Sequence, residues 1–394
     1  MAEHFLGQRP LDVHYGKGAL AALASELDRH GVRKPLIVTG PAIASNRQMI
    51  DTLREALGHP VADIFSKTTA HTPRSIVLAG CAAIRAHGAD GLISFGGSST
   101  SDTMKAIAWG LAEDLHEPEG FAPFAATHDG ETLRFPEMTR DPLPTFAVPT
   151  TLSAGEFSPF VAMKDEAAGT KDFYRDERLA PKAVILDPML TLATPERLWL
   201  ASGIKAIDHC IESLLSPAAQ PFTDALVAHA LPSLFRNLRL SHENPADLDA
   251  RQHCQIAAWM SFCSGPNIEM GLSHGIGTIL GGRFDVPHGE TSCVMLPHVM
   301  AYNLGETKCR QAWIAELLGV ATVGDADASA AAAPEAVADL IASLGLPQRL
   351  RDLGLARTAI PVIASDILGS YLPRINPRPL RSASQIATWL ESAW

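Results

Sequence analysis

Four short apolar runs in the first half of the chain each end in turn residues. Segments with a helical pattern, residues 18–30 and 74–87, lie between the earlier runs. Strands that alternate with helices predict a parallel sheet with helices on both faces. Ligands of such sheets bind beyond the carboxyl ends of the strands, where the turn residues lie. The four predicted strands and their turns span residues 35–40, 91–97, 146–151 and 183–188.

The pattern changes after Thr194, where Pro195 and Glu196 form a helix start signal. Helical periodicity then continues almost to Trp394, and strand patterns nearly vanish. We predict an α/β domain over residues 1–190 and an all-α domain over residues 191–394, consistent with a length of 394 residues. The alanine-rich stretch 325–338 is predicted to be a loop that leads into a helix near Pro334.

Charge and composition bear on the classes of partner, on the compartment and on the state of the thiols. The 32 basic and 43 acidic side chains give a net charge of −11, and no basic run is present. This argues against nucleic acid and anionic membranes as partners. No signal peptide and no run of about 20 apolar residues is found. The six cysteines form no CxxC pair, so we expect reduced thiols in a cytoplasmic protein. They are Cys81, Cys210, Cys254, Cys263, Cys293 and Cys309.

Two polar loops after predicted strands are candidates for binding a cofactor. The first is a glycine turn, Gly96-Gly97-Ser98-Ser99-Thr100-Ser101-Asp102, which precedes a predicted helix over residues 103–111. Its glycines permit close approach of a ligand, and the free amides of a helix start suit a pyrophosphate. The second contains Thr150, Thr151 and Ser153, which could bind the rest of a cofactor. Each loop is equally compatible with a plain turn.

Three histidines and a lysine form a second constellation. Lys205 and His209 are four residues apart in a predicted helix and therefore share a face. His274 and His288 follow in glycine-punctuated segments. The three histidines could converge on a divalent metal, or each could be structural.

These motifs, in this order, resemble the iron-containing (group III) alcohol dehydrogenase family, and within it the maleylacetate reductases, over essentially the whole chain. The resemblance implies an NAD(P)-binding domain and a helical domain in a dehydroquinate synthase-like architecture, a cleft between them and a homodimer. It also implies that the glycine turn holds the pyrophosphate and that Thr150 and Thr151 lie near the nicotinamide. Gly40 stands where NAD-specific relatives carry an acidic residue, so NAD and NADP both remain open. The resemblance rests on residues 96–100, 149–151, 281–288 and 376–379 and on the helix that contains His209.

One departure from the family pattern changes the expected chemistry. Metal-dependent members bind the metal with one Asp and three His, and the histidine positions correspond to His209, His274 and His288. The Asp position is Lys205. An ammonium repels a cation by roughly 4 kcal/mol per pair of unit charges at about 4 Å, and a divalent ion doubles this. Asp208 is predicted to point about 100° around the helix and to be a poor replacement. We therefore expect no tightly bound Fe²⁺ or Zn²⁺; if a metal binds at all, its ligands are the three histidines.

The sequence thus predicts an NAD(P)-dependent oxidoreductase that reduces an aldehyde or oxo-acid carbonyl, similar to maleylacetate reductase. Lys205 replaces the metal by donating a hydrogen bond or proton to the carbonyl oxygen, and the three histidines orient substrate or relay the proton. One alternative is a metal-dependent alcohol dehydrogenase with Fe or Zn. Another is a family member without redox activity, either a non-redox enzyme or a binding protein. Two features stay open. Arg283, Lys164 and Lys171 either receive a substrate carboxylate or lie at the surface, and the segment 113–142 is either a flap or a surface excursion.

Overall fold

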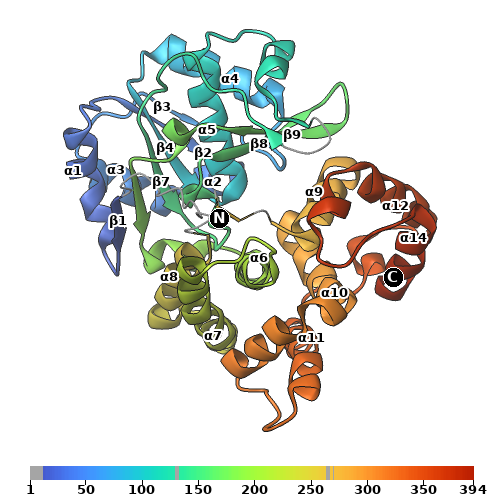
Figure 1. Cartoon of the computed structure of the whole chain (residues 1–394). Helices are drawn as coiled ribbons and strands as arrows, with labels where there is room; N and C mark the ends of the chain where they lie inside the picture. Colours follow the sequence, from blue (N-terminus) through green and yellow to red (C-terminus); the bar gives the residue numbers. More distant parts are fainter. Residues whose placement is uncertain (1–11, 129–132, 263–266, 269) are drawn as a thin grey trace. The chain divides into compact units, whose positions relative to one another are not determined.

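The computed structural model describes residues 12–128, 133–262, 267–268 and 270–394. These residues form two compact units that meet in sequence at Thr194 and Pro195. We call the described residues up to Thr194 the sheet unit and those from Pro195 to Trp394 the helical unit (Figure 1).

The sheet unit is built on six strands in the order β1-β10-β7-β4-β2-β3. Every neighbouring pair is parallel, which confirms the predicted sheet. The four predicted strands are β2, β4, β7 and β10. The edge strands β1 and β3 were not predicted because they are short and only partly buried. The strands are Asp12–Tyr15 (β1), Pro35–Thr39 (β2), Asp63–Phe65 (β3), Gly91–Gly96 (β4), Thr145–Pro149 (β7) and Ala183–Leu186 (β10).

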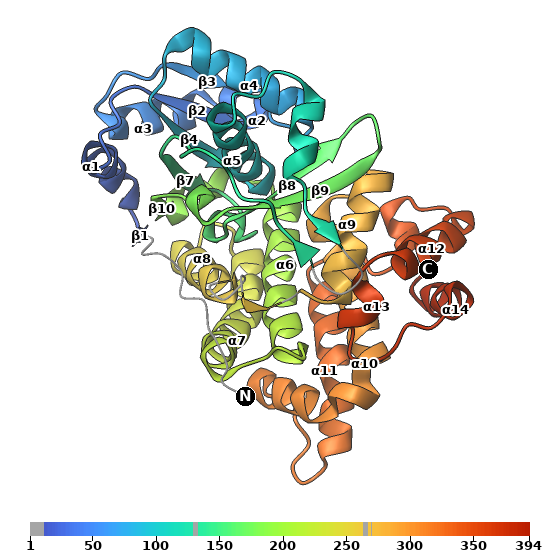
Figure 2. The same cartoon turned by 45° about the horizontal axis from the view of Figure 1, so that its top comes forward.

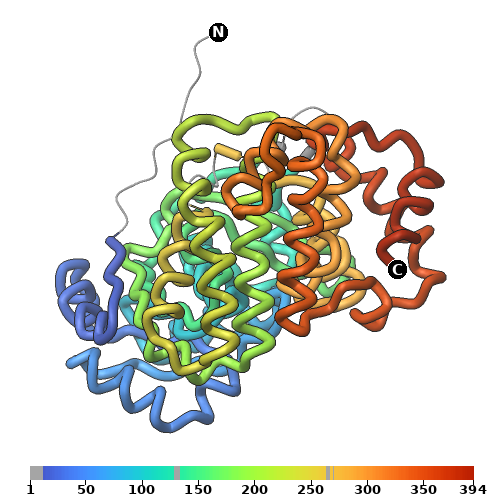
Figure 3. Tube along the Cα trace, turned by 90° about the horizontal axis from the view of Figure 1, so that it is seen from below, coloured from blue at the N-terminus to red at the C-terminus, as the bar shows by residue number. Residues whose placement is uncertain are grey.

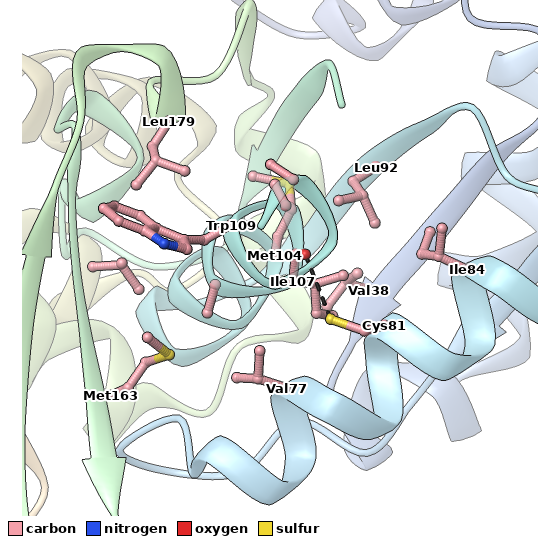
Figure 4. Close-up of a cluster of buried hydrophobic side chains, with 14 of the residues drawn as sticks. Val38, Val77, Cys81, Ile84, Leu92, Met104, Ile107, Trp109, Met163 and Leu179 are labelled. Atoms are coloured by element: carbon pink, nitrogen blue, oxygen red, sulfur yellow. Dashed lines mark hydrogen bonds between the residues drawn. The ribbon is translucent and has the colours of Figure 1, made fainter. Parts of the chain in front are cut away.

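Helices cover both faces of this sheet, which explains why its central strands are apolar throughout. On β2, Leu36 and Val38 pack against α4 and α5, whereas Ile37 packs against α1 and α3. Figure 4 shows part of the first core, with Trp109 of α5 and Cys81 of α4 among the buried side chains. The helices are Ala22–Arg29 (α1), Pro41–Ser45 (α2), Arg47–Leu57 (α3), Arg74–His87 (α4) and Ser98–Ala112 (α5).

An antiparallel hairpin that the sequence did not predict lies beside α5 (Figure 2). Its strands are β8 (Phe160–Asp165) and β9 (Thr170–Arg175). Tyr174 of β9 packs edge-on against Trp109, with ring centroids 5.6 Å apart. The same tyrosine ring contacts Phe121, which is fully buried. Phe121 belongs to the segment 113–142, so this part of the segment contributes to the core. Its other described elements are a 3-10 helix (Pro118–Phe124) and the strands β5 (Thr127–His128) and β6 (Leu133–Arg134), and residues 129–132 lie outside the described residues.

The described part of the helical unit contains no strand, as predicted. Its α6 is buried almost throughout and is flanked by α7, which in turn lies beside α8 (Figures 1 and 3). The alanine-rich stretch is helical from Ala326, and the expectation of a loop there is wrong. The Asp325 carboxylate accepts the amides of Asp327 and Ala328 and so starts the helix. The helices are Glu196–Leu215 (α6), Pro221–Glu243 (α7), Leu248–Phe262 (α8), Leu272–Phe284 (α9), His288–Leu318 (α10), Ala326–Ser343 (α11), Ile360–Gly369 (α12), Leu372–Ile375 (α13) and Ala383–Ala393 (α14).

The motif at residues 376–379 fastens the C-terminal segment to α10. Asn376 and Asn303 exchange amide hydrogen bonds of 2.8 and 2.9 Å. Arg378 donates to the Tyr302 carbonyl and stacks on the Tyr302 ring. The motif is therefore accounted for by packing.

The described cysteines are free thiols, and four of them are buried. Burial raises the pKa of Cys81 to about 12 and raises the pKa values of Cys210, Cys254 and Cys293 as well. Buried thiols with raised pKa values are poor nucleophiles. Cys263 lies outside the described residues. None of the described helices is both long enough and apolar enough to cross a membrane.

Candidate active site

The glycine turn lies where the strand order of the sheet reverses. From β2 the chain moves outward to β3 and then returns to β4 on the other side of β2. The loops after β2 and β4 therefore separate, which is the usual position of a ligand in such sheets. Gly40 follows β2 and Gly96 ends β4. Gly96 has φ +151°, and a Cβ there would lie 2.8 Å from the Thr100 Oγ1, so this position requires glycine.

Helix α5 begins at Ser98, five residues earlier than predicted, with Gly97 as its N-cap. Ser98, Ser99, Thr100 and Asp102 thus lie inside the helix. No side chain caps its first turn, so the first amides are available to an anion. A Cβ on Gly97 would lie 3.1 Å from the Thr151 Cγ2. These features fit a dinucleotide pyrophosphate.

The second predicted loop lies directly beside this turn. Thr150 donates its amide to the Gly96 carbonyl at 3.0 Å, and the Thr151 hydroxyl donates to the Ser153 hydroxyl at 3.4 Å. The structure adds Thr68, which the sequence analysis missed, from the loop after β3. Its hydroxyl lies 3.4 Å from the Thr100 hydroxyl and 3.5 Å from where a Cβ of Gly40 would be. Four loops thus present small and hydroxyl side chains at one edge of the sheet.

A buried charge cluster underlies these loops. The Lys105 ammonium is fully buried, pairs with Asp102 at 3.1 Å and donates to the Gly155 and Phe160 carbonyls. The Asp102 carboxylate, which is partly exposed, is therefore engaged by Lys105. Burial raises the pKa of Glu156 to about 7, even though Lys105 opposes the shift. Burial also lowers the pKa of Lys171, with Asp102 opposing.

Glu156 makes the stability of the protein depend on pH. Its native pKa of about 7 exceeds the ordinary value of 4.5, so its favourable contribution holds below pH 4.5 and is lost as the pH rises through 7. A shift of that size corresponds to about 3 kcal/mol. We compare the unfolding free energy of Glu156→Gln with that of wild type. We expect this difference to shift in favour of the variant by up to about 3 kcal/mol when the pH rises from 4.5 to 8. Urea unfolding at both pH values measures this, and an equal difference at the two would contradict it.

The helical unit brings the predicted lysine and histidines together. Lys205 and His209 lie on α6, His274 lies in the first turn of α9, and His288 is the first residue of α10. The His209 and His274 rings are stacked with centroids 4.8 Å apart. His288 meets His274 edge-on at 6.1 Å. A Cβ on Gly277 would lie 3.0 Å from the His288 ring, so this glycine leaves space for it.

Asp208 lies inside this cluster, and the expectation that it points away is wrong. It lies three residues after Lys205, and its carboxylate lies 3.8 Å from the Lys205 ammonium and 3.3 Å from the His274 Nδ1. It also accepts hydrogen bonds from the Ser292 hydroxyl at 2.6 Å and the Ser273 hydroxyl at 3.0 Å. Residues three apart on a helix share a face, and packing turns this face toward α9 and α10.

Glu212, also missed from the sequence, holds the start of α9. Its carboxylate accepts the backbone amides of Gly271 and Ser273 at 2.9 and 2.6 Å, and that of His274 at 3.4 Å. The same carboxylate lies 2.7 Å from the His274 Nδ1. A Cβ on Gly271 would meet the Glu212 Oε1 at 2.8 Å, which explains the glycine.

The protonation of the cluster follows from these contacts. Burial, together with the charges of His274 and Lys205, holds the pKa of His209 well below 6.5, so its imidazole is neutral at pH 7. The pKa of His274 is raised, because Asp208 and Glu212 outweigh the opposing effects of burial and Lys205. The pKa of Asp208 is lowered, since His274, Lys205 and Ser292 outweigh its burial.

Asp208, Glu212 and His274 also form a group whose potential metal ligand atoms lie within 4.8 Å of one another. The Glu212 oxygens already accept three backbone amides. The His274 atom that faces both carboxylates is Nδ1, whereas its buried Nε2 has no hydrogen-bond partner among the described residues. This pattern is typical of carboxylates that orient a histidine from behind.

The other basic candidates lie elsewhere. Arg283 is half exposed and forms two contacts with Asp366. Lys164 and Lys171 lie on the hairpin strands β8 and β9 of the sheet unit. Glu290 pairs with Arg197 at 2.6 Å. Of these groups, only Lys171 adjoins a cluster described above.

Comparison with known proteins identifies the family. The iron-containing alcohol dehydrogenase model matches residues 10–188, and the model for the C-terminal region of that family matches residues 199–394. The chain belongs to the iron-containing alcohol dehydrogenase family. Its membership agrees with the resemblance inferred from the motifs.

Individual relatives match over nearly the full length. The maleylacetate reductase of Burkholderia cepacia is 32% identical over 384 residues, which cover 97% of this chain and 95% of that protein. The 4-hydroxybutyrate dehydrogenase of Cupriavidus necator is 31% identical over 379 residues, covering 94% and 95%. The crystal structure of a 1,3-propanediol oxidoreductase matches with a TM-score of 0.89 and 29% identity, covering 100% of both chains. These relatives support an oxidoreductase function for this member of the family.

Proposed function

We propose that this protein is an NAD(P)-dependent reductase of an aldehyde or oxo-acid carbonyl, similar to maleylacetate reductase, which works without a tightly bound metal. The observation that carries the proposal is Lys205, a buried ammonium 3.8 Å from Asp208 that interacts electrostatically with His209 and His274. In this proposal the glycine turn and the Thr150-Thr151 loop bind NAD(P). NAD(P)H, when bound there, supplies a hydride. Gly40 offers no carboxylate to repel a 2′-phosphate, so both cofactors are compatible.

The helical unit supplies charge and protons to the carbonyl oxygen. Negative charge develops on that oxygen during reduction, and a fixed positive charge in a buried site stabilises it. Lys205 provides this charge and donates a hydrogen bond or the proton. Asp208, held by two serine hydroxyls, keeps the ammonium in place. The neutral His209, together with His274 and His288, orients the substrate or passes on the proton.

The positive charge of Lys205 disfavours tight binding of a metal cation by the helical unit. The His274 Nε2 is buried without a hydrogen-bond partner among the described residues, and the His209 ring stacks on that of His274. However, Lys205 places a positive charge one helical turn before His209, and this charge, together with burial, lowers the pKa of His209. The same charge opposes the net rise in the pKa of His274. A divalent ion would meet the same repulsion. The grouping of Asp208, Glu212 and His274 favours the metal-dependent alternative. However, the Glu212 oxygens could bind a metal only after losing hydrogen bonds that they accept from backbone amides.

The proposal is tested by comparing metal-stripped protein with protein loaded with Fe²⁺ or Zn²⁺. NADH and NADPH oxidation is followed with maleylacetate and a panel of aldehydes and oxo acids, and metal content is measured by mass spectrometry. We expect equal turnover in both samples and far less than one ion per chain as purified. Turnover only after loading would establish the metal-dependent dehydrogenase instead. Cofactor binding without turnover of any substrate would favour a family member without redox activity.

A further inference from the structure

We propose that Glu212 is a positioning residue for His274, which it holds with Nδ1 as the hydrogen-bond donor and Nε2 directed to the reacting groups. The inference rests on the proposed function, since it assigns the part of the site that fixes one of its histidines. The motivating contact is the 2.7 Å distance between the Glu212 Oε2 and the His274 Nδ1.

Glu212 does more than cap a helix. A cap requires only the contacts to the backbone amides at the start of α9, and Glu212 makes three of these. The ring contact is an additional one, and it joins the carboxylate directly to the side chain that stacks on His209. The carboxylate is 4% exposed, so water does not compete with these donors.

Glu212 is better placed than Asp208 to orient the ring. Asp208 lies 3.3 Å from the His274 Nδ1, and its carboxylate is shared with two serine hydroxyls and with Lys205. Glu212 is closer, and its two oxygens are fixed by the backbone of the helix that carries His274. The ring and its partner are thus anchored to the same helix start, which restricts rotation of the imidazole.

The consequence concerns the other ring nitrogen. A neutral imidazole carries one proton, and a carboxylate at Nδ1 retains that proton there. Nε2 then has a lone pair, and it is buried without a hydrogen-bond partner among the described residues. The His209 Nδ1 also faces a hydrogen-bond acceptor, although the contact is longer and the acceptor is a neutral hydroxyl. This nitrogen lies 3.4 Å from the Ser261 hydroxyl, which already donates to the Ala258 carbonyl and is therefore an acceptor for the ring.

The direct test is the tautomer of His274 in the wild-type protein. Selective ¹⁵N-histidine labelling, with the signal assigned by its loss in His274→Asn, gives the ring nitrogen shifts at a pH where the imidazole is neutral. We expect the Nδ1–H form in wild type and a mixture or the Nε2–H form in Glu212→Gln. An Nε2–H form in wild type, or an unchanged tautomer in the variant, would overturn the proposal.

Kinetics separates positioning from simple stabilisation. We expect Glu212→Gln to lower kcat by about 10- to 100-fold, as loss of the partner that orients a functional histidine commonly does, with little change in KM for NAD(P)H. In a His274→Ala background the same substitution should cause no further loss of kcat. An equal loss in both backgrounds would mean that Glu212 acts only through the fold.

A matched control and a second variant complete the design. Asp325 also caps a helix with its carboxylate, at α11, and contacts no histidine, so Asp325→Asn should lower Tm without changing kcat. If Glu212→Gln does not fold, Gly271→Ala displaces the carboxylate by its Cβ and is read by the same tautomer measurement. If the wild type turns over no substrate, the proposed function fails, whereas the tautomer still decides the role of Glu212.

Discussion

Lys205→Ala is expected to lower kcat for NAD(P)H-dependent carbonyl reduction by about 100- to 1000-fold, the usual effect of removing one preorganised donor to a developing oxyanion. The substitution removes both the positive charge and the proton proposed to meet the carbonyl oxygen. Binding of NAD(P)H, which the sheet unit is proposed to provide, should be unchanged. Steady-state kinetics and fluorescence titration of the cofactor measure the two effects separately.

The first control tests whether an added amine can take the place of the missing Lys205 side chain. A small primary amine added to Lys205→Ala should restore part of the lost turnover, whereas it should not affect wild type. Lys308→Ala, which removes an exposed lysine paired with Asp327, should leave kcat unchanged. Asp208 keeps its two serine donors in the Lys205 variant, so the fold is expected to persist, as circular dichroism would verify. Unchanged turnover in Lys205→Ala would eliminate the ammonium as the substitute for the metal.

The layered sheet could be predicted because its central strands are apolar on both faces. Residues such as Leu36 and Ile37 bury on opposite sides, and this produces continuous apolar runs that end in turns. The edge strands carry no such signal. The β8–β9 hairpin carries a weaker signal, because only alternate residues such as Val161, Met163 and Tyr174 are buried in the core that contains α5. Between them the polar pair Lys171 and Asp172 looks like a surface loop in sequence.

The order of the motifs along the chain was enough to single out the glycine turn and the histidines as site candidates. It did not reveal which other side chains contact them. The start of α5 was placed too late because Ser98, Ser99 and Thr100 are more typical of a cap than of a helix interior. In the structure the Thr100 hydroxyl lies 3.4 Å from the Thr68 hydroxyl, a contact between distant segments that local sequence does not reveal.

The carboxylates behind His274 illustrate the same limit. Helical periodicity gives the angle between Lys205 and Asp208, and a spacing of three residues could have suggested their contact. It does not reveal that α9 and α10 direct serine hydroxyls at Asp208. Glu212 lies one turn beyond Asp208, and its role depends on the start of a helix about 60 residues later. Such contacts are set by tertiary packing and are not encoded in any local pattern.

The charges on α6 bear on the proposal that Lys205 takes the place of a metal. Two buried carboxylates, Asp208 and Glu212, would be costly without compensating charge or donors. The Lys205 ammonium offsets part of this charge. Serine hydroxyls donate to the Asp208 Oδ2 and backbone amides to both Glu212 oxygens, whereas the buried Asp208 Oδ1 has no hydrogen-bond partner among the described residues. Under the proposed function, a divalent cation in this cluster would meet the positive charge of the Lys205 ammonium.

This repulsion predicts that Lys205→Asp converts the cluster into a metal site. The substitution replaces a repulsive charge with a carboxylate one turn before His209 and gives the one Asp and three His that the resemblance assigns to metal-dependent members. Removing a repulsion of roughly 8 kcal/mol between an ammonium and a divalent ion at about 4 Å, and adding an attraction, should increase Zn²⁺ affinity by at least about 1000-fold even after allowance for desolvation.

Isothermal titration calorimetry of metal-stripped wild type and Lys205→Asp with Zn²⁺ measures the difference. Lys205→Asn is the matched control, since it removes the positive charge without supplying a carboxylate, and it should bind with intermediate affinity. A His288→Ala substitution added to Lys205→Asp should reverse most of the gain, because it removes one of the three nitrogen ligands. Equal, tight Zn²⁺ binding by wild type and Lys205→Asp would show that the ammonium does not prevent metal binding, and it would favour a metal-dependent dehydrogenase.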